Sequence, residues 1–149
     1  MTDSQRILNE FISNIKQIGE KKGFYYEPRI AIPTIKNIFN LTQRENRALI
    51  CTISTHVSTG EKPLWGIMKN TIDEFQQEKM NWGIVLLHKT SESGYLLSST
   101  DVINNLRYWP LSSKAQYLVT LNNLINCKKF YSINVCIDLL IQINRPKND

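Results

Sequence analysis

The two histidines, His56 and His88, each follow an apolar run of residues that favours a β-strand. Side chains at strand ends can meet at one edge of a sheet, where α/β proteins commonly place their sites. The two rings could therefore act as acid and base, or could bind a metal ion together with Cys51. No carboxylate lies near either histidine in the sequence at a spacing that would let it assist the ring. The alternative is therefore that both histidines are polar residues that reach water.

Three glutamates could support metal-dependent cleavage of a phosphodiester. Mg²⁺ takes oxygen ligands, activates water and neutralises the charge that develops on the phosphate. A rearranged catalytic site could draw on Glu10, Glu27 and Glu45. Lys36 or Lys62 would supply its cation. The alternative is that Glu10 lies on the solvated face of a helix and that Glu27 is exposed on an edge strand.

The three cysteines, Cys51, Cys127 and Cys136, are odd in number and lack the paired spacing of zinc sites or disulfide scaffolds. We expect reduced thiols, and Cys51 and Cys136 lie within apolar patterns where cysteine behaves as a small buried hydrophobe. The sequence contains no glycine-rich phosphate loop and no GxSxG, HExxH or CxxC motif. Most enzyme classes that can be recognised from a motif are thereby excluded.

Lysine and arginine outnumber aspartate and glutamate by 18 to 13, which gives a formal net charge of +5. This surplus would favour DNA or RNA as a partner if it were gathered on one face, whereas a dispersed surplus would only increase solubility. The side chains that we expect to contact phosphate are Lys16, Lys21, Lys22, Arg29, Arg44 and Arg47. The run Arg107-Tyr108-Trp109 combines a cation with aromatic area on which a base could stack.

The chain has 149 residues, of which 42% are hydrophobic, and this is a common size for one domain with one core. We expect a single domain over residues 1–149, with a core at about 4–103 and a C-terminal strand and helix in 104–144. No apolar stretch is long enough to cross a bilayer, and we expect no signal peptide. We therefore expect a cytoplasmic protein that does not contact a membrane.

Periodicity in the first third of the chain predicts a helix followed by a strand. Apolar residues recur at steps of three and four, which indicates a helix that begins near Asp3 or Ser4 and ends at Gly23. Residues 24–32 are rich in aromatic and β-branched types, as in a strand. Pro28 cannot donate to a ladder, so the strand should lie at a sheet edge or have interrupted pairing there.

The rest of the chain alternates between strand and helix patterns. Residues 33–46 could form either a short helix or an irregular strand. The patterns predict a strand at 48–55, a helix at 63–80, a strand buried on both faces at 82–87, its hairpin partner at 95–98, a short helix from Ser99 or Thr100 to before Pro110, and an edge strand at 116–121. Ser132 opens a last helix with one formal charge, Asp138, so we expect that helix to be covered on most sides.

The order of these elements resembles the layout of the PD-(D/E)xK nuclease superfamily. The segments that carry the resemblance are the helix that ends in Lys21-Lys22-Gly23-Phe24, the strand 48–55, the helix 63–80, and the pair 82–87 with 94–97. Within that superfamily the layout is similar to small Holliday-junction resolvases and restriction-type endonucleases, over residues 4–103. The resemblance implies an α/β fold with a central mixed sheet of about four to five strands, flanked by helices on both faces.

The residues that would carry the chemistry of this superfamily are missing from the expected positions. The resemblance implies a carboxylate on one strand and, on the next, a second carboxylate two residues before a lysine. This sequence has Thr52 and Ser54 at that spacing, and residues 33–44 contain no aspartate or glutamate. Two hydroxyls cannot hold Mg²⁺ alone. We therefore expect the usual catalytic residues to be absent or relocated.

Three functions remain open from the sequence. The first is binding or processing of nucleic acid on a nuclease-like fold. The second is a non-catalytic subunit that binds another protein or a second copy of the chain. The third is a Mg²⁺-dependent endonuclease with an unusual site built from Glu10, Glu27 and Glu45.

Overall fold

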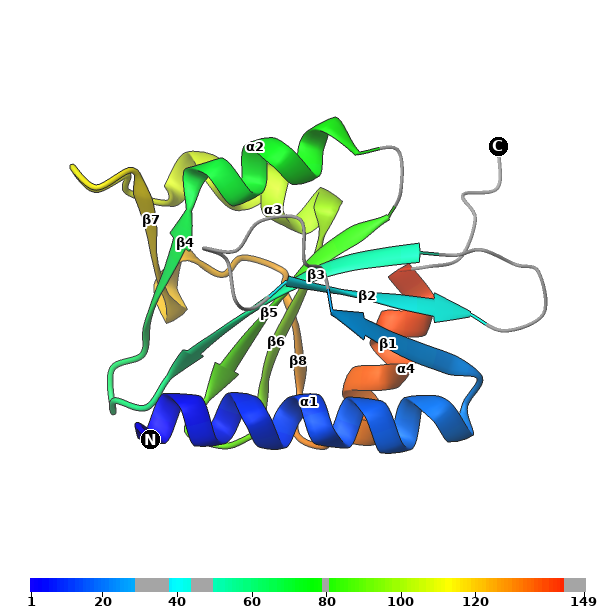
Figure 1. Cartoon of the computed structure of the whole chain (residues 1–149). Helices are drawn as coiled ribbons and strands as arrows, with labels where there is room; N and C mark the ends of the chain where they lie inside the picture. Colours follow the sequence, from blue (N-terminus) through cyan, green and yellow to red (C-terminus); the bar gives the residue numbers. More distant parts are fainter. Residues whose placement is uncertain (29–37, 44–49, 79–80, 144–149) are drawn as a thin grey trace.

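The computed structural model describes residues 1–28, 38–43, 50–78 and 81–143, apart from the side chains of Gln43, Ile50 and Cys51. Within these residues the chain is an α/β protein with four α-helices, a six-stranded mixed sheet and a two-stranded sheet (Figure 1). The elements are α1 (Asp3–Lys21), β1 (Phe24–Pro28), β2 (Ile38–Gln43), β3 (Ile50–Ser58), β4 (Leu64–Met68), α2 (Lys69–Gln77), β5 (Trp82–His88), β6 (Gly94–Ser98), α3 (Ser99–Asn105), β7 (Gln116–Thr120), β8 (Lys128–Phe130) and α4 (Ile133–Ile143). Two short 3-10 turns, Leu106–Tyr108 and Leu121–Asn123, lie on either side of β7.

The large sheet has the strand order β1-β2-β3-β5-β6-β8. Neighbouring strands are antiparallel except β3 and β5, which are parallel and are connected through β4 and α2. The expectation of four to five strands was too low for the described part of the chain. It omitted the three-residue strand β8, which is too short to show a period, and it left the segment that contains β2 undecided. The edge strand expected at 116–121 exists as β7, which pairs with β4 in the small sheet.

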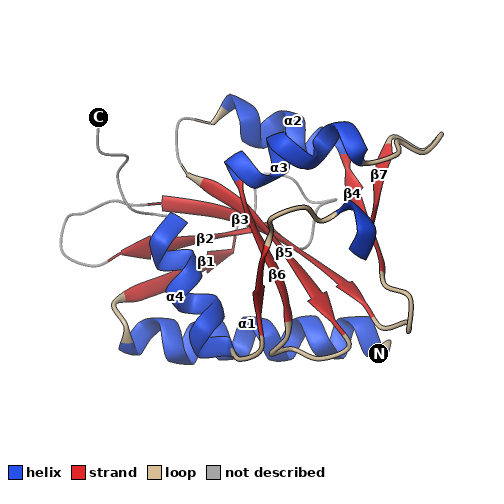
Figure 2. Ribbon diagram, turned by 180° about the vertical axis from the view of Figure 1, so that it is seen from behind, coloured by secondary structure: helices blue, strands red, loops and turns tan. Residues whose placement is uncertain are grey.

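The helices cover both faces of the large sheet, as expected. Figures 1 and 2 show α1 and α4 on one face, and α2, α3 and the small sheet on the other. The first face buries the apolar stripes of α1 and α4, including Phe11 and Ile137. The second buries Phe75 of α2 together with Trp65 of β4 and Trp109. The six-stranded sheet therefore separates two hydrophobic layers.

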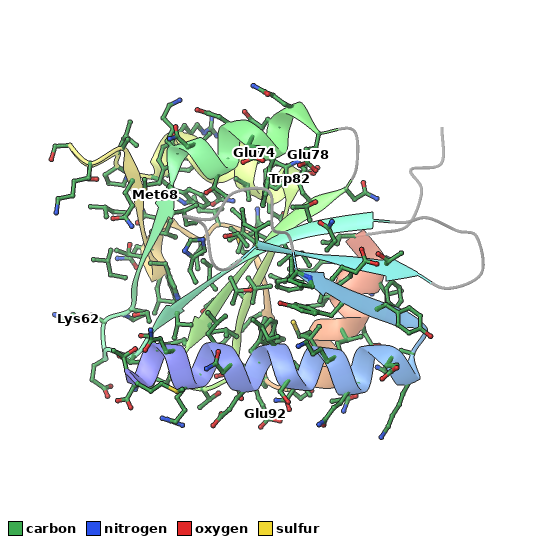
Figure 3. The ribbon with its side chains drawn as sticks, in the orientation of Figure 1. Lys62, Met68, Glu74, Glu78, Trp82 and Glu92 are labelled. Carbon is green, nitrogen blue, oxygen red and sulfur yellow. The ribbon has the colours of Figure 1, made fainter. Side chains whose placement is uncertain are left out.

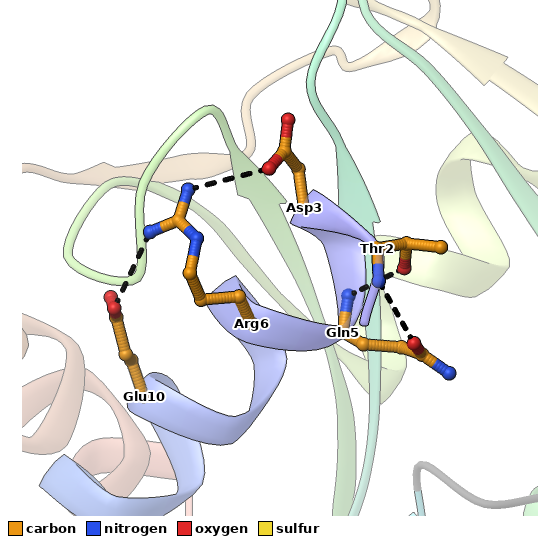
Figure 4. Close-up of polar contacts among 5 residues, drawn as sticks. All are labelled: Thr2, Asp3, Gln5, Arg6 and Glu10. Carbon is orange, nitrogen blue, oxygen red and sulfur yellow. Dashed lines mark hydrogen bonds and ion pairs between the residues drawn. The ribbon is translucent and has the colours of Figure 1, made fainter.

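The first helix begins at Asp3 and ends before Gly23, as expected, but Thr2 caps it instead of Asp3 or Ser4. The Thr2 hydroxyl accepts a hydrogen bond from the Gln5 backbone at 3.2 Å, and the Gln5 side chain accepts one from the Thr2 backbone at 3.1 Å (Figure 4). This capping box satisfies two donors that the helix itself leaves unpaired. After the last turn, Gly23 has a φ of 84°, a conformation that glycine adopts without steric cost.

The predicted helix at 63–80 was wrong in its first part. Residues Leu64–Met68 form β4, and the helix begins only at Lys69. Trp65 and Ile67 are buried while Leu64 and Met68 are exposed, which is the alternation of a strand. A run of so few residues fits both the spacing of apolar residues in a helix and their alternation in a strand. Pairing with β7, about 50 residues later in the chain, decides between them.

The last helix is covered less than expected. Ser132 does open it, because its hydroxyl accepts a hydrogen bond from the Val135 backbone at 3.2 Å. However, α4 buries only Ile133, Cys136, Ile137 and Leu140, and its other residues are partly or fully exposed. The helix packs with one face on the sheet and α1, so few formal charges do not imply burial on most sides.

Other expectations are confirmed within the described residues. Residues Trp82–Leu87 are buried without interruption in β5, and β6 is its hairpin partner. β1 is an edge strand, as Pro28 requires. The sequence left residues 33–46 open between a helix and a strand, and residues 38–43 of this segment form the strand β2. Residues 29–37 lie outside the described part. None of the described helices combines the length and apolar content needed to cross a bilayer.

Candidate functional site

A row of polar residues runs along the central strand β3. Thr52, Ser54, His56 and Ser58 alternate with Ile53, Thr55 and Val57, so the four share the face of the sheet toward α2 and β4. Thr52, Ser54 and Ser58 are buried, and we call the four residues the polar row of β3. Buried polar groups are costly unless they find hydrogen-bond partners. Ser58 Oγ accepts a hydrogen bond from the Leu64 backbone at 3.1 Å, and the other three residues fall into two parts.

The first part is a network around Thr52. Its hydroxyl lies 3.1 Å from Asn40 Oδ1 on β2 and 3.3 Å from Glu78 Oε2 at the end of α2. Glu27 of β1 pairs in register with Asn40, which pairs with Thr52, so the three side chains stand on one face. Figure 3 shows Glu74 on α2 and Glu78 directly after the end of this helix. No local sequence signal indicated Glu78, because its partner is 26 positions away.

The second part is a hydrogen-bonded chain from Ser54 through His56. Ser54 Oγ lies 2.9 Å from His56 Nε2, and the imidazole also bonds with the backbone of Gly66 on β4. Burial lowers the pKa of His56 to about 4, and the bond with Gly66 acts in the opposite direction. His56 is therefore neutral at pH 7. Ser54 is only 1% exposed, so its hydroxyl holds the ring in place instead of meeting a substrate.

An open cavity of about 850 Å³ lies beside the second half of β3, and we call it the α1–β3 cavity. Ile38 at the start of β2 pairs with Ser54, so the described residues of β2 leave the edge of β3 beyond Ser54 uncovered. The first half of α1 forms one wall of the cavity, and Ser54 and His56 belong to another. The remaining described lining comes from β4, the start of α2 and Gln116 of β7.

His88 lies at the same end of the sheet as His56, as the sequence indicated, but in a different setting. Ser58 pairs with His88, which places the two histidines on neighbouring strands. His88 Nε2 is 3.0 Å from the Gly60 carbonyl oxygen, and its ring meets Trp65 edge-on at 6.1 Å. Among the described residues, no three His, Cys, Asp or Glu side chains gather to hold a metal ion.

The candidate glutamates do not share one site in the described part of the chain. Glu10 is exposed on α1, where Arg6 Nη1 lies 3.4 Å from its Oε1, and Asp3 is 3.8 Å from the same guanidinium (Figure 4). Glu27 is exposed on the edge strand β1. Glu45 lies outside the described residues. The proposed catalytic trio is therefore not seen as a group in the part of the chain that the structure covers.

The candidate phosphate-binding lysines lie on the second half of α1 and just beyond it. Lys16 Nζ stands 4.8 Å from the ring centre of Tyr26, and Lys22 Nζ lies 2.9 Å from Asp138 Oδ1. Lys21 is exposed in the last turn. The other three candidates, Arg29, Arg44 and Arg47, lie outside the described residues.

The basic surplus of the sequence does not come from the described residues. They contain eleven basic and eleven acidic side chains, whereas residues 29–37, 44–49, 79–80 and 144–149 contain seven basic and two acidic ones. A nucleic-acid contact on the described surface would therefore depend on local groupings and not on a general positive field.

Two such groupings combine a cation with an exposed aromatic ring. Lys129 Nζ lies 4.8 Å from the ring centre of Tyr131, which is 73% exposed, and 5.7 Å from that of Tyr95. The guanidinium of Arg107 lies 4.8 Å from the ring centre of Tyr108. The neighbouring Trp109, in contrast, is buried in the core and donates to the Asn123 carbonyl oxygen at 3.0 Å, which makes it structural.

The two cysteines whose side chains are described are free thiols. Burial raises the pKa of Cys127 to about 12 and raises the pKa of Cys136 further. A thiolate is the reactive form of cysteine, so neither residue is suited to nucleophilic chemistry at neutral pH.

Comparison with known proteins gives no relative from which a function could be carried over. No protein-family model matches the chain, and no curated protein matches it in sequence. Proposals about function must therefore start from the fold, the α1–β3 cavity and the two cation–aromatic groupings.

Proposed function

We propose that the protein binds DNA or RNA through exposed cation–aromatic groupings on an α/β fold laid out like that of the PD-(D/E)xK nucleases. The observation that carries this proposal is the placement of Lys129 over Tyr131 at the end of the edge strand β8. Tyr131 is the most exposed aromatic side chain among the large apolar residues that the structure describes.

The chemistry of this grouping suits a nucleic acid. An open tyrosine ring offers a face on which a base of any type can stack, and the ammonium beside it can neutralise a phosphate. A hydrogen bond with Tyr131 is the main cause that raises the pKa of Lys129, so the ammonium remains charged at neutral pH. Arg107 and Tyr108 provide a second grouping of the same kind.

The arrangement of strands supports the nuclease-like part of the proposal. α1 is followed by the antiparallel meander β1-β2-β3, and β3 is parallel to β5, which the chain reaches through α2. Thr52 and Ser54 lie on β3 at the centre of this sheet. The layout implied by the resemblance thus has hydroxyls in place of a carboxylate and a lysine.

Within the residues that the structure describes, no three His, Cys, Asp or Glu side chains gather as ligands for magnesium. Mg²⁺ is usually bound through one or two carboxylates together with substrate phosphates and water. Glu10 is instead paired with Arg6 on the outer face of α1, away from the polar row of β3. No step of a metal-dependent cleavage is therefore derived, and binding without cleavage is the function that we put forward.

The test is fluorescence anisotropy of short labelled single strands and duplexes at about 50 mM salt, where phosphate contacts are strong. Tyr131→Ala should weaken binding roughly 5-fold to 100-fold, because stacking on one aromatic ring contributes about 1–3 kcal/mol. Lys129→Gln should reduce the slope of the logarithm of affinity against the logarithm of salt concentration by about one, because one phosphate contact is lost. Lys114→Gln, which removes an exposed lysine before β7, is the matched control. Equal affinities for all four proteins, or no binding by the wild type, would refute the proposal.

A non-catalytic interaction subunit is a second candidate, and one surface favours it. Leu111, Leu121 and Ile125 are each between 43% and 49% exposed around β7. Asn123 holds this region together, since its Nδ2 donates to the Tyr108 carbonyl oxygen at 2.7 Å. Exposed apolar side chains that form one patch mark protein contacts. Light scattering should then show a dimer that Leu121→Glu dissociates, and a monomer at every concentration would argue against self-association.

A further inference from the structure

The α1–β3 cavity has the size and form of a ligand site that neither the cation–aromatic groupings nor the polar network around Thr52 uses. Its volume of about 850 Å³ falls within the range of about 300–1,000 Å³ that is typical of small-molecule pockets. Its walls come from α1, β3, β4, α2 and β7, which are parts of the chain more than 100 residues apart. The cavity is therefore formed by the packing of several helices and strands and not by one loop.

The charge of the lining restricts the ligand. Among the lining residues that the structure describes, no side chain carries a formal charge, and His56 is neutral at pH 7 because burial lowers its pKa. Met1 brings its terminal ammonium group to the rim formed by α1. A phosphate or carboxylate placed against the side chains of β3, β4 and β7 would lose water without gaining a counter-charge, which is unfavourable. The ligand part that lies against these strands should therefore be uncharged.

Three carboxamides are among the polar groups of the lining, beside the hydroxyls of Ser4, Ser54 and Thr71 and the imidazole of His56. Gln5 and Asn9 come from α1, and Gln116 from β7. Each carboxamide presents one acceptor and two donors, and this combination pairs with the donor–acceptor edge of a nucleobase. Gln5 uses its Oε1 to cap α1, which leaves its NH₂ group as a donor for another partner.

Gly66 fixes the position of one of these carboxamides. A Cβ atom at residue 66 would overlap the carboxamide of Gln116, so this side chain can lie against β4 only because residue 66 is glycine. The hydrogen bond between His56 and the Gly66 backbone joins the imidazole to the same wall. Gly66 thus couples the Gln116 carboxamide with the Ser54–His56 chain.

The rest of the lining is aliphatic or thioether. Leu8 and Ile12 of α1, Val57 of β3 and Met68 of β4 belong to it. Apolar side chains on the walls with a few polar groups between them are the usual composition of a site for a flat heterocycle. Methionine adds a flexible, polarisable surface that adapts to a ring.

We propose that the α1–β3 cavity binds an uncharged nucleobase, either as a free nucleoside or as a base turned out of a nucleic-acid strand. The second source rests on the proposed nucleic-acid function, whereas the first stands without it. In both cases the ring lies between the aliphatic walls, its edge meets the carboxamides, and any phosphate remains outside the described lining.

The first experiment titrates isotope-labelled protein with adenosine, guanosine, cytidine and uridine and follows the amide signals of residues 54–57 and 66–71 by NMR. At least one nucleoside should bind and shift these signals, and ribose 5-phosphate should not. Leu8→Trp, at a half-buried position in the wall, should abolish binding by filling the cavity. Gly66→Ala should weaken it roughly tenfold by displacing Gln116, which is the effect of about one lost hydrogen bond.

Gly60→Ala is the matched control, because a Cβ there would meet only the Lys62 carbonyl oxygen at an ordinary 3.8 Å. Its nucleoside affinity should equal that of the wild type. The proposal is overturned if no nucleoside binds at millimolar concentration, if Leu8→Trp binds as well as the wild type, or if ribose 5-phosphate causes the same shifts.

The second experiment separates the two sources. A single strand that contains 2-aminopurine becomes more fluorescent when that base leaves the stack, and Leu8→Trp should remove this increase if the base enters the cavity. Binding of nucleosides without the increase assigns the cavity to a free nucleoside. Tyr131→Ala and Lys129→Gln should leave nucleoside affinity unchanged, so that failure of the proposed nucleic-acid surface and failure of the cavity give different results.

Discussion

Acid should destabilise the protein through His56, and the effect can be calculated from the structure. Burial lowers the pKa of His56 from 6.5 to about 4. Because the pKa in the folded state lies below that of the unfolded chain, the unfolded chain binds more protons between these two values. The contribution of His56 to stability is therefore fully present above about pH 6.5 and is lost as the pH falls toward 4.

The size of this loss follows from the difference between the two pKa values. At about 1.36 kcal/mol for each unit, His56 should lower the free energy of unfolding by about 2 kcal/mol at pH 5 and about 3 kcal/mol at pH 4. Marginal stabilities of about 5–15 kcal/mol make such a loss easy to measure.

The assay is urea denaturation of the wild type, His56→Gln and His88→Gln at several pH values between 7.5 and 4, which bracket the expected titration. His56→Gln removes the titrating group, so its free energy of unfolding should fall less with acid than that of the wild type, by about 3 kcal/mol at pH 4. His88→Gln should follow the wild type. If the wild type and His56→Gln lose stability in parallel, then His56 does not titrate as a buried, neutral residue and the reasoning about the uncharged cavity loses its main support.

Two further changes test the packing that positions the site. Trp65→Phe removes the hydrogen bond from Nε1 to the Leu87 carbonyl oxygen, which spans 2.9 Å, and should lower the free energy of unfolding by about 1–3 kcal/mol because a buried acceptor loses its partner. Urea denaturation measures this loss, and an unchanged midpoint would contradict it. Thr2→Ala removes the capping box at the start of α1 and should cost about 1 kcal/mol, whereas Thr2→Asn should largely restore stability because asparagine also caps helices. A destabilised Thr2→Asn would show that the cap is not the cause.

The sequence was a sound guide wherever a long, regular pattern dictated a local structure. The 19 residues of α1 repeat their apolar stripe over five turns, so that no other element fits, and Gly23 marks its end. The continuous apolar run of β5 likewise required burial on both faces. Both patterns are long enough that tertiary contacts only confirm what the local residues already favour.

Short or weak patterns were decided by partners far away in the sequence. Leu64–Met68 fits a helix and a strand equally well, and its pairing with β7 makes it a strand. β8 has only three residues, and it exists because β6 offers it a free edge. The exposed outer face of α4 could not be foreseen, because its residue types alone do not show how many neighbours pack around it.

The candidate site shows the same division. The residue pattern alone put two hydroxyls, Thr52 and Ser54, on one face of β3 and put both histidines near the ends of their strands. Only the tertiary structure decided that His56 bonds with Ser54 and Gly66, that Glu78 reaches Thr52, and that Gln116 completes the wall of a cavity. Residue types fix which interactions are available, whereas distance and burial, which depend on the whole chain, fix which of them form and at what pKa.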